Sequence, residues 1–528
     1  MKSVDLAIIG AGPAGMTAAL EAAKNNVKTL IIDEQMWAGG QLVKQTHKFF
    51  GSKFCFAGTR GIDIARKLVK NIEEQEIELW LNAKCIGLTN TKEVEVIKDG
   101  IAKKVIAKTV ILASGAAELP VAFPGWDLPG VMGAGAAQTM INLHRVLPGN
   151  NVLMVGAGNV GLIVSYQLLQ AGVKVSAIVE ATSQIGGYGV HAAKIRRMGV
   201  PILTSTIIKA AEGENEVERA VIAKVDHKGK IISGTVEKIK VDTICIAVGL
   251  RPLSELAWMA GCNFSYASKR GGYVPIFNDW MESSVKGIYV AGDLAGVEEA
   301  SIAMEEGRLC GNSAAKDLGY LDEEIAIKSR QNIMERLDTL RNKKKIGEKL
   351  IKVENINNKM AQSKEDNLAS KGYLSMQELT KSPGFPSKKR LQEGPVAVIE
   401  CTQAIPCNPC EKACPIGAIF VGKSLMHPPI LNEELCIGCG QCISACPGLA
   451  IFSLDMTFND SNALIGLPYE FLPLPKPGSI VKGTDRAGKY VCQAHVVSVK
   501  NPVSYDHAPV VCISVPKKHA QNVRSFIL

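Results

Sequence analysis

The chain has 528 residues, too many for one hydrophobic core, so we expect roughly three or four domains. Its formal charge of +9, from 60 Lys and Arg against 51 Asp and Glu, is too mild to indicate nucleic-acid binding. With 47% hydrophobic residues and no apolar run of about 18 residues, no membrane span is predicted. A strand begins within the first residues, which leaves no room for a signal peptide and favours a cytoplasmic protein.

The first predicted element is a βαβ unit in residues 4–33, read from the apolar strand VDLAIIG, an Ala-rich helix and the strand VKTLIID. Its turn fits G-x-G-x-x-G with Gly10, Gly12 and Gly15, a pattern that holds a pyrophosphate at a helix N-terminus. Asp33 and Glu34 end the second strand, where an acid meets a ribose hydroxyl. The alternative is a glycine turn that packs the helix and binds no ligand.

A second copy of this unit spans residues 151–180, with Gly156, Gly158 and Gly161 in its turn. Its strand ends in Glu180, and a carboxylate there favours NAD over NADP. The alternatives are another adenine nucleotide, or none. Arg196 and Arg197 could serve a 2′-phosphate, but an exposed helix face would explain them as well.

Three further apolar strands, TVILASG, TICIAVG and GIYVAGD, end in glycine, as strands do where a ligand lies at their carboxyl ends. We predict that all three join the first sheet, which the second module interrupts. The first 320 residues contain no C-x-x-C pair, which disfavours thioredoxin-reductase chemistry. Their cysteines are scattered and are expected to be core residues: Cys55, Cys85, Cys245, Cys262 and Cys310.

After residue 319 the composition becomes polar and helix-permissive, then rich in Pro, Gly and Ser, which predicts a helical connector and a linker. Lys343, Lys344 and Lys345 are expected on a solvated helix face, or as a docking site for an acidic partner. In the last segment, residues 457–528, apolar and polar residues alternate as in β-strands, and the sequence indicates no role for it.

Eight cysteines fall within 46 residues. The run Cys436, Cys439, Cys442, Cys446 before Pro447 has the spacing C-x₂-C-x₂-C-x₃-C-P, in which ferredoxin thiolates hold a [4Fe-4S] cluster.

An earlier run matches this pattern at an offset of 32, with Cys407, Cys410 and Cys414 in place of the last three cysteines. The position that corresponds to Cys436 is Ala404, and the missing thiol stands three residues earlier as Cys401. We therefore expect an elongated loop and a second half-site.

The resemblance to two-cluster ferredoxins implies that the fourth cysteine of each run ligates the other cluster. One cluster is then held by Cys401, Cys407, Cys410 and Cys446, and the other by Cys414, Cys436, Cys439 and Cys442. Zinc is the alternative, but two C-P endings fit closed zinc sites poorly.

The amino-terminal motifs resemble those of flavoproteins with two dinucleotide-binding domains. GIYVAGD, with Gly292 and Asp293, resembles their second FAD fingerprint, and GGQL, with Gly40 and Gln41, resembles the loop along the isoalloxazine. The strand end ILASGA, with Gly115, lies between these two motifs, so that all of them follow the order found in such flavoproteins. The resemblance implies FAD in the first module.

The stretches PGWDLPGVMGAGAAQTMIN, GGYGVHAAKIRRMGVPI and CIAVGLRPL narrow this resemblance further. Their order is similar to the FAD/NAD-type subunits of dye-linked L-proline dehydrogenase, opine oxidase and hydrogen cyanide synthase, and to a region of heterotetrameric sarcosine oxidase. In that family such a chain is an electron-transfer partner of a flavoprotein subunit that oxidises an amine or amino acid. The family resemblance also allows FMN at a subunit interface, but no residue here identifies it.

The predicted fold is α/β, with Rossmann-like FAD (1–116, 244–320) and NAD-type (117–243) domains, a helical connector and linker (321–394), a two-[4Fe-4S] ferredoxin-like domain (395–456) and a β-rich tail (457–528). The predicted function is that of an electron-transfer subunit in a hetero-oligomeric amino-acid or amine dehydrogenase. It would link a substrate-oxidising flavoprotein subunit to NAD, ferredoxin or a small iron-sulfur subunit. The catalytic residues are unknown, and nucleic acid is not expected as a partner. The alternatives are a self-contained NADH:ferredoxin oxidoreductase and a non-catalytic scaffold with structural clusters.

Overall fold

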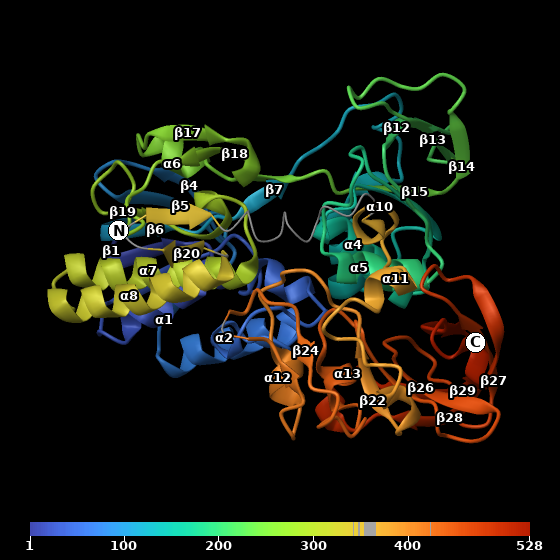
Figure 1. Ribbon diagram of the computed structural model, residues 1–528. Helices are drawn as coiled ribbons and strands as arrows, with labels where there is room; N and C mark the ends of the chain where they lie inside the picture. The colour runs from blue at the N-terminus through green and yellow to red at the C-terminus, as the bar shows by residue number, and fades with distance from the viewer. Residues whose placement is uncertain (342, 347–348, 353–365, 423) are drawn as a thin grey trace. The chain divides into compact units, whose positions relative to one another are not determined.

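The computed structural model describes residues 1–341, 343–346, 349–352, 366–422 and 424–528, which form two compact units (Figure 1). The first unit holds Met1–Phe49, Lys53–Leu119 and Gly249–Val353, and the second holds Phe50–Ser52, Pro120–Val248 and Glu354–Leu528. Among the described residues, no helix has the length and apolar character needed to cross a membrane.

A seven-stranded sheet forms the centre of the first unit, in the order β3-β2-β1-β6-β5-β4 with β19 beside β6. The last six residues of β1 include five that are buried, because parallel strands covered on both faces are apolar throughout. The strands are β1 (Lys2–Ile9), β2 (Thr29–Ile32), β3 (Glu78–Trp80), β4 (Ala83–Leu88), β5 (Glu93–Lys98), β6 (Ile101–Leu112) and β19 (Ile288–Val290).

Helix α1 (Pro13–Ala23) packs closely on α7 (Ala300–Asp317). A Cβ at Gly307 would lie 2.1 Å from the carbonyl oxygen of Ala14, and one at Gly311 would lie 2.3 Å from that of Ala18. These two glycines therefore allow the backbones of the two helices to touch.

Helix α8 (Glu323–Leu340) is capped by Asp322, whose side chain accepts hydrogen bonds from two backbone N–H groups of the first turn. This confirms the predicted helix after residue 319. Lys343, Lys344 and Lys345, in contrast, lie in strand β20 (Lys343–Ile346), which pairs with β21 (Lys349–Lys352), so the expected helix is wrong there.

The remaining elements of the first unit are the 14-residue helix α2 (Gly61–Glu74) and several short ones: η1 (Gly40–Lys44), η2 (Lys53–Cys55), β7 (Ala116–Glu118), β16 (Leu250–Pro252), α6 (Glu255–Met259), β17 (Phe264–Ala267), η4 (Ser268–Arg270), β18 (Gly272–Pro275) and η5 (Gly292–Ala295).

The second unit begins with a parallel sheet in the order β11-β10-β9-β15-β8 and a smaller antiparallel sheet β12-β13-β14. The prediction that Thr243–Ile246 joins the first sheet is wrong, because this strand, β15, pairs with β9 and β8. The elements are β8 (Val131–Gly133), α3 (Ala134–Thr139), η3 (Met140–His144), β9 (Asn151–Val155), α4 (Asn159–Gln170), β10 (Lys174–Val179), α5 (Gly189–Arg197), β11 (Ile202–Leu203), β12 (Thr206–Glu212), β13 (Arg219–Lys224), β14 (Glu237–Lys240) and β15 (Thr243–Ile246).

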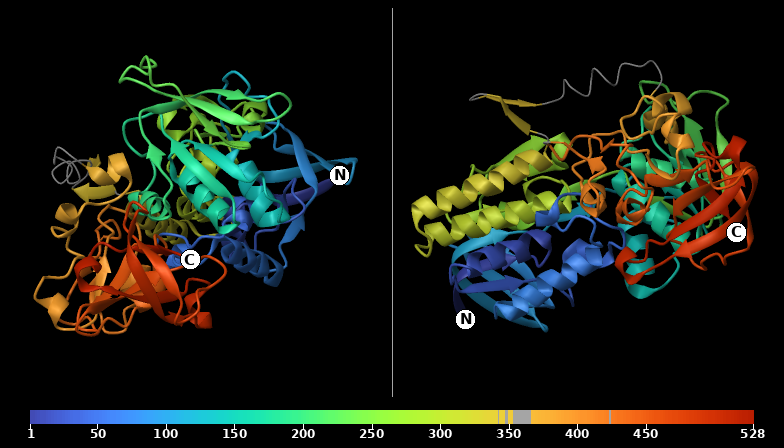
Figure 2. Two further views of the ribbon diagram at one scale, coloured as in Figure 1. Left: turned by 90° about the vertical axis from the view of Figure 1, so that its right-hand side faces the viewer. Right: turned by 60° about the horizontal axis from the view of Figure 1, so that its bottom comes forward.

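The carboxy-terminal part of the second unit forms another seven-stranded sheet, in the order β22-β25-β26-β29-β28-β27-β30 (Figure 2, orange to red). Strands β22 (Val396–Ile399) and β25 (Ile451–Asp455) flank the two cysteine runs, and the tail supplies β26 (Asn462–Pro468), β27 (Ile480–Thr484), β28 (Tyr490–Lys500), β29 (Val510–Pro516) and β30 (Ser525–Ile527). The tail therefore continues the sheet of the cysteine-rich segment.

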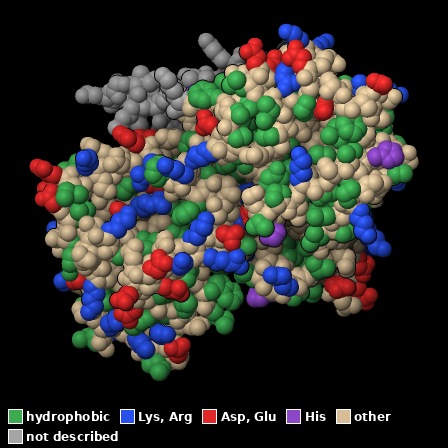
Figure 3. Space-filling view, turned by 90° about the horizontal axis from the view of Figure 1, so that it is seen from below, with side chains coloured by type: hydrophobic (Ala, Val, Ile, Leu, Met, Phe, Trp, Pro, Cys, Tyr) green, Lys and Arg blue, Asp and Glu red, His purple; other side chains and the backbone are tan. Residues whose placement is uncertain are grey.

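Short elements complete this part: α10 (Asn367–Lys371), α11 (Met376–Leu379), η6 (Arg390–Gln392), α12 (Pro409–Ala413), β23 (Ile419–Phe420), β24 (Ile430–Leu431), α13 (Gln441–Ala445), η7 (Val503–Tyr505) and η8 (Lys517–His519). Val190 of α5 belongs to the same apolar core as this sheet. On the face shown in Figure 3, basic and acidic side chains are interspersed.

Candidate functional site

The first glycine loop joins β1 to α1, and its three glycines have different surroundings. Gly10 has φ +108°, and a Cβ there would lie 2.3 Å from the carbonyl oxygen of Ala113. A Cβ at Gly15 would lie 1.9 Å from the Gly10 oxygen, whereas one at Gly12 would meet no atom within 4 Å. Gly10 and Gly15 thus permit the turn and the helix contact, and Gly12 leaves bare backbone where a pyrophosphate could approach the helix N-terminus.

The acid beside this loop is Asp33. Its Oδ2 accepts a hydrogen bond from Ala11 N at 2.6 Å, and its Oδ1 accepts one from Gln35 N at 2.8 Å. Glu34, the neighbouring candidate, is exposed. Asp33 is therefore the better placed of the two for a ribose hydroxyl.

The GGQL loop lies directly against the glycine loop. Gly39 N donates to the carbonyl oxygen of Ala11 at 2.8 Å, and a Cβ at Gly40 would lie 2.8 Å from the Cα of Gly12. Gln41 follows in η1 and is exposed. The structure thus brings together Gly12 and Gly40, which are far apart in the sequence.

Asp293 is a largely buried carboxylate with little hydrogen bonding. Its Oδ1 accepts one long hydrogen bond, from Glu298 N at 3.4 Å, and burial raises its pKa to about 6. Gly292, at φ +68°, donates to Glu306 Oε2 at 2.9 Å, and a Cβ at Gly115 would meet no atom within 4 Å. A carboxylate in this setting fits a ligand that donates hydrogen bonds, as the hydroxyl groups of a ribityl chain do.

The second glycine loop repeats the geometry of the first. Gly156 has φ +109°, and a Cβ there would lie 2.2 Å from the carbonyl oxygen of Ala247. A Cβ at Gly161 would lie 2.1 Å from the Gly156 oxygen, and one at Gly158 would again meet nothing within 4 Å. The backbone is therefore as open to a pyrophosphate here as in the first module.

Glu180 occupies the place of Asp33. Its Oε2 accepts from Ala157 N at 2.9 Å, and its Oε1 accepts from Thr182 N at 3.0 Å. Gly187 N donates to the carbonyl oxygen of Ala157 at 2.9 Å, as Gly39 N does to Ala11. A glycine loop, an acid and a second glycine turn thus recur in both modules.

Arg197 differs from both interpretations offered by the sequence, whereas Arg196 is half-buried. Arg197 is only 7% exposed, and its Nη2 donates to the carbonyl oxygen of Leu449 at 2.8 Å. Arg196 donates to the carbonyl oxygen of Val200 at 2.9 Å and lies 5.6 Å from the centre of the Tyr373 ring. Arg197 is therefore neither on an exposed helix face nor placed to meet a ribose phosphate.

The eight clustered cysteines line two separate spaces. The first cysteine pocket, of about 440 Å³ including space open to solvent, is lined by Cys401, Cys407, Cys410 and Cys446. Phe50 and Val190 also line it, and Gly51 forms a bridge pair with Cys407. Each of the two cysteine runs contributes to this pocket.

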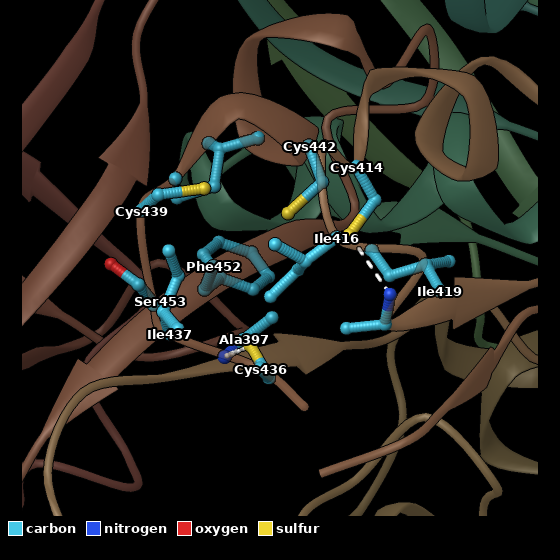
Figure 4. A pocket seen from close by; sticks show the side chains of 14 residues that line it. Ala397, Cys414, Ile416, Ile419, Cys436, Ile437, Cys439, Cys442, Phe452 and Ser453 are labelled. Atoms are coloured by element: carbon cyan, nitrogen blue, oxygen red, sulfur yellow. Dashed lines mark hydrogen bonds between the residues drawn. The ribbon is translucent and has the colours of Figure 1, made fainter. Parts of the chain in front are cut away.

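The second cysteine pocket, of about 370 Å³ including space open to solvent, is lined by Cys414, Cys436, Cys439 and Cys442. Their side chains turn toward the space between them (Figure 4), and backbone N–H groups donate to two of the sulfurs: Ala418 N to Cys414 at 3.1 Å and Ala397 N to Cys436 at 3.3 Å. In the part of the chain that the structure describes, no group of three or more His, Cys, Asp or Glu residues could hold a single metal ion.

Burial raises the pKa of several of these thiols, in Cys410 to about 12, and also in Cys401, Cys407, Cys442 and Cys446. Thiolates at these positions therefore require neighbouring cations, which the iron atoms of a cluster supply. The donor set fits such a group, because thiolates are the ligands of iron-sulfur clusters.

Four of the five scattered cysteines in the first 320 residues are buried, as expected. Cys55, Cys245, Cys262 and Cys310 are buried, Cys85 is half-buried, and in the tail Cys492 and Cys512 are buried within β28 and β29. Burial raises the pKa of Cys55 to about 12 and that of Cys85 to about 11. These are unreactive thiols of the core.

A buried charge network that the sequence did not indicate lies beside the first pocket. Glu400, which precedes Cys401, accepts hydrogen bonds from Arg486 at 2.6 Å and from Arg524 at 2.6 Å. All three side chains are buried. Since Glu400 lies more than 80 positions from each arginine in the sequence, no local spacing could have revealed the network.

The arrangement of two nucleotide loops and thiol pockets defines an FAD-dependent oxidoreductase with an iron-sulfur domain. Residues 4–307 match the pyridine nucleotide-disulphide oxidoreductase family, and residues 429–452 match the 4Fe-4S binding domain. Because the first match covers more than half of the chain, the chain belongs to the pyridine nucleotide-disulphide oxidoreductase family. This membership implies FAD and NAD(P) binding, and the second match implies a [4Fe-4S] cluster.

The chain is 27% identical to the HcnB subunit of hydrogen cyanide synthase from Pseudomonas protegens over 359 residues, 64% of this chain and 76% of the relative. It is 29% identical to a subunit of opine oxidase from Agrobacterium tumefaciens over 357 residues, 62% of this chain and 69% of the relative. These matches confirm the family resemblance. The thioredoxin reductase structure of T. acidophilum shares the fold (TM-score 0.50, 19% identity, 60% of this chain and 99% of that chain).

Proposed function

We propose that this chain is the electron-transferring flavoprotein and iron-sulfur subunit of a hetero-oligomeric amino-acid or amine dehydrogenase. A second flavoprotein subunit oxidises the substrate, and this chain passes the electrons between that subunit, FAD, two [4Fe-4S] clusters and NAD or a ferredoxin-like carrier. The relatives named as subunits of opine oxidase and hydrogen cyanide synthase support this assignment.

The observation that carries the proposal is the division of the eight cysteines between two pockets. Cys446 ends the second run but lines the first pocket, and Cys414 ends the first run but lines the second pocket. This exchange of the fourth cysteine is the arrangement expected for two [4Fe-4S] clusters. Only the second run lies within the matched 4Fe-4S domain, so the cluster in the first pocket rests on this geometry.

The residues of the chain bind and orient these groups. Gly12 and Asp33 would hold the pyrophosphate and ribose of FAD, and Asp293 would accept hydrogen bonds from the ribityl chain. Gly158 and Glu180 would hold NAD or another adenine nucleotide in the same way. A flavin exchanges electrons in pairs or singly, whereas a [4Fe-4S] cluster exchanges one at a time, so the chain would convert between the two.

A self-contained NADH:ferredoxin oxidoreductase is the second candidate, and the equal geometry of the two glycine loops favours it. Such an enzyme would need no substrate-oxidising subunit. This candidate would be supported if the isolated chain reduced ferredoxin with NADH as fast as the protein purified from its source does.

The test is to purify the complex anaerobically under native conditions, identify its subunits, and quantify iron, sulfide and flavin. The proposal predicts a flavoprotein partner, about eight irons per copy of this chain, and reduction of flavin and clusters by an amine or amino acid. Purification without a partner, with full reduction by NADH alone, would contradict the dehydrogenase assignment.

A further inference from the structure

Arg197 is a buried cation that the electron-transfer role does not explain. It ends α5 in the second nucleotide module, but its hydrogen bond is made to Leu449, in the loop that follows Cys446. Of the acidic groups that act on its charge, which include Tyr166 and Cys446, the strongest is Glu400, and Glu400 is already paired with Arg486 and Arg524. An arginine remains charged in such a place, and burying it without an ion pair of its own is costly.

The hydrogen bond of Arg197 ends on a peptide group that contacts a cysteine sulfur. The carbonyl oxygen of Leu449 and the N–H of Ala450 belong to the same peptide unit. Arg197 Nη2 donates to that oxygen at 2.8 Å, and Ala450 N donates to Cys446 Sγ at 3.5 Å. A cation at the carbonyl end polarises the peptide and strengthens the hydrogen bond that its N–H makes at the other end.

The same helix also reaches the first cysteine pocket at its amino-terminal end. Gly189 N donates to Gln403 Oε1 at 2.6 Å, and Val190 lines the pocket beside the cysteines. Both ends of α5 therefore contact the loops of this pocket, which holds Arg197 in place relative to Cys446.

The second cysteine pocket has no equivalent contact among the described residues. Its N–H···S hydrogen bonds come from Ala397 and Ala418. Its arginine, Arg390, is half-buried and donates to the carbonyl oxygens of Cys436 and Pro395. Arg197 approaches this pocket only through the ring of Phe452, at 5.2 Å from the ring centre.

We propose that Arg197 is a positioning residue that raises the reduction potential of the cluster held in the first cysteine pocket, by polarising the Leu449–Ala450 peptide that donates to Cys446. Positive charge and N–H···S hydrogen bonds both favour the reduced, more negative state of a cluster. This inference rests on the proposed function, since it requires a cluster in that pocket.

The test is an anaerobic redox titration of the full chain, followed by EPR, for the wild type, Arg197→Met and Arg197→Gln. In Arg197→Met, the midpoint potential of the first-pocket cluster falls, and it falls by more than that of the second. Cys401→Ala assigns the signals, because the signal that remains belongs to the second pocket. Arg196→Met is the matched control, since Arg196 donates within its own module to Val200, and neither potential should change.

An unchanged first-pocket potential, or an equal or larger shift in the second, would overturn the proposal. If Arg197→Met fails to retain both clusters, Arg197→Gln decides: glutamine can still donate a hydrogen bond but carries no charge, so the first potential must still lie below that of the wild type. A wild-type chain with fewer than two clusters would instead refute the proposed function, a result that the titration distinguishes from the absence of a shift.

Discussion

The two cysteine pockets arise from one repeated sequence pattern but have different surroundings. The first pocket is bordered by Val190 of α5 and lies beside the buried pair of Glu400 and Arg486. The second is lined by Ile416 and Ile437, which are 41% and 60% exposed. Equal cysteine spacing therefore does not make equal sites: the potential of a cluster depends on the charges, hydrogen bonds and solvent around it.

The largest expected difference between the two pockets follows from a substitution that removes one cluster and leaves the other. Cys401→Ala removes the thiol of the elongated loop, so the iron content should fall from about eight to about four per chain while the second-pocket signal stays. Iron analysis and EPR measure this. Cys262→Ala is the matched control, because this buried thiol belongs to the other unit, and its iron content should equal that of the wild type.

The next effect concerns stability. Glu400→Gln leaves Arg486 and Arg524 without their buried carboxylate, and breaking such a pair costs about 3–5 kcal/mol. We expect the midpoint of chemical denaturation, followed through the iron-sulfur absorbance, to fall accordingly. Glu393→Gln removes only an exposed partner of Lys389 and should change the free energy of unfolding by about 1 kcal/mol or less. Similar losses in both variants would show that the network does not stabilise the protein.

The same network gives a smaller, pH-dependent effect. Burial alone would raise the pKa of Glu400, but Arg486 and Arg524 outweigh it and lower the pKa from 4.5 to about 2. Since the pKa is depressed in the folded state, the stabilisation is complete above about pH 4.5 and is lost as the pH falls toward 2. The difference in unfolding free energy between wild type and Glu400→Gln should therefore shrink over this range, and a constant difference would exclude the ionised pair as its source.

Substitutions in the two glycine loops should leave both cysteine pockets unchanged. A Cβ at Gly158 would meet no protein atom within 4 Å and the residue has φ −73°, so Gly158→Val should fold but exclude a nucleotide. Both clusters and the FAD should remain, as measured by iron and flavin analysis. Gly12→Val is the parallel variant of the first module and should lose FAD instead. Loss of the first cluster in Gly158→Val would mean that this pocket depends on the ligand and not only on the packing of α5.

The resemblance to two-cluster ferredoxins predicted the division of the cysteines, and local spacing was enough to predict both βαβ units, because glycine turns are set by residues close in sequence. The sheet to which Thr243–Ile246 belongs was not predictable in this way, since any buried parallel strand has the same apolar pattern. The burial of Arg197 and Glu400 was missed for a related reason: both depend on packing between segments far apart in the chain, and a charged residue in sequence suggests an exposed one.

The central claim, that the fourth cysteine of each run serves the other cluster, is tested most directly by comparing EPR spectra of reduced Cys446→Ala and Cys414→Ala chains. The account predicts that Cys446→Ala loses the same signal as Cys401→Ala, and that Cys414→Ala loses the other one. If Cys446→Ala instead loses the signal that depends on Cys442, the runs are independent and the assignment of the two pockets is wrong.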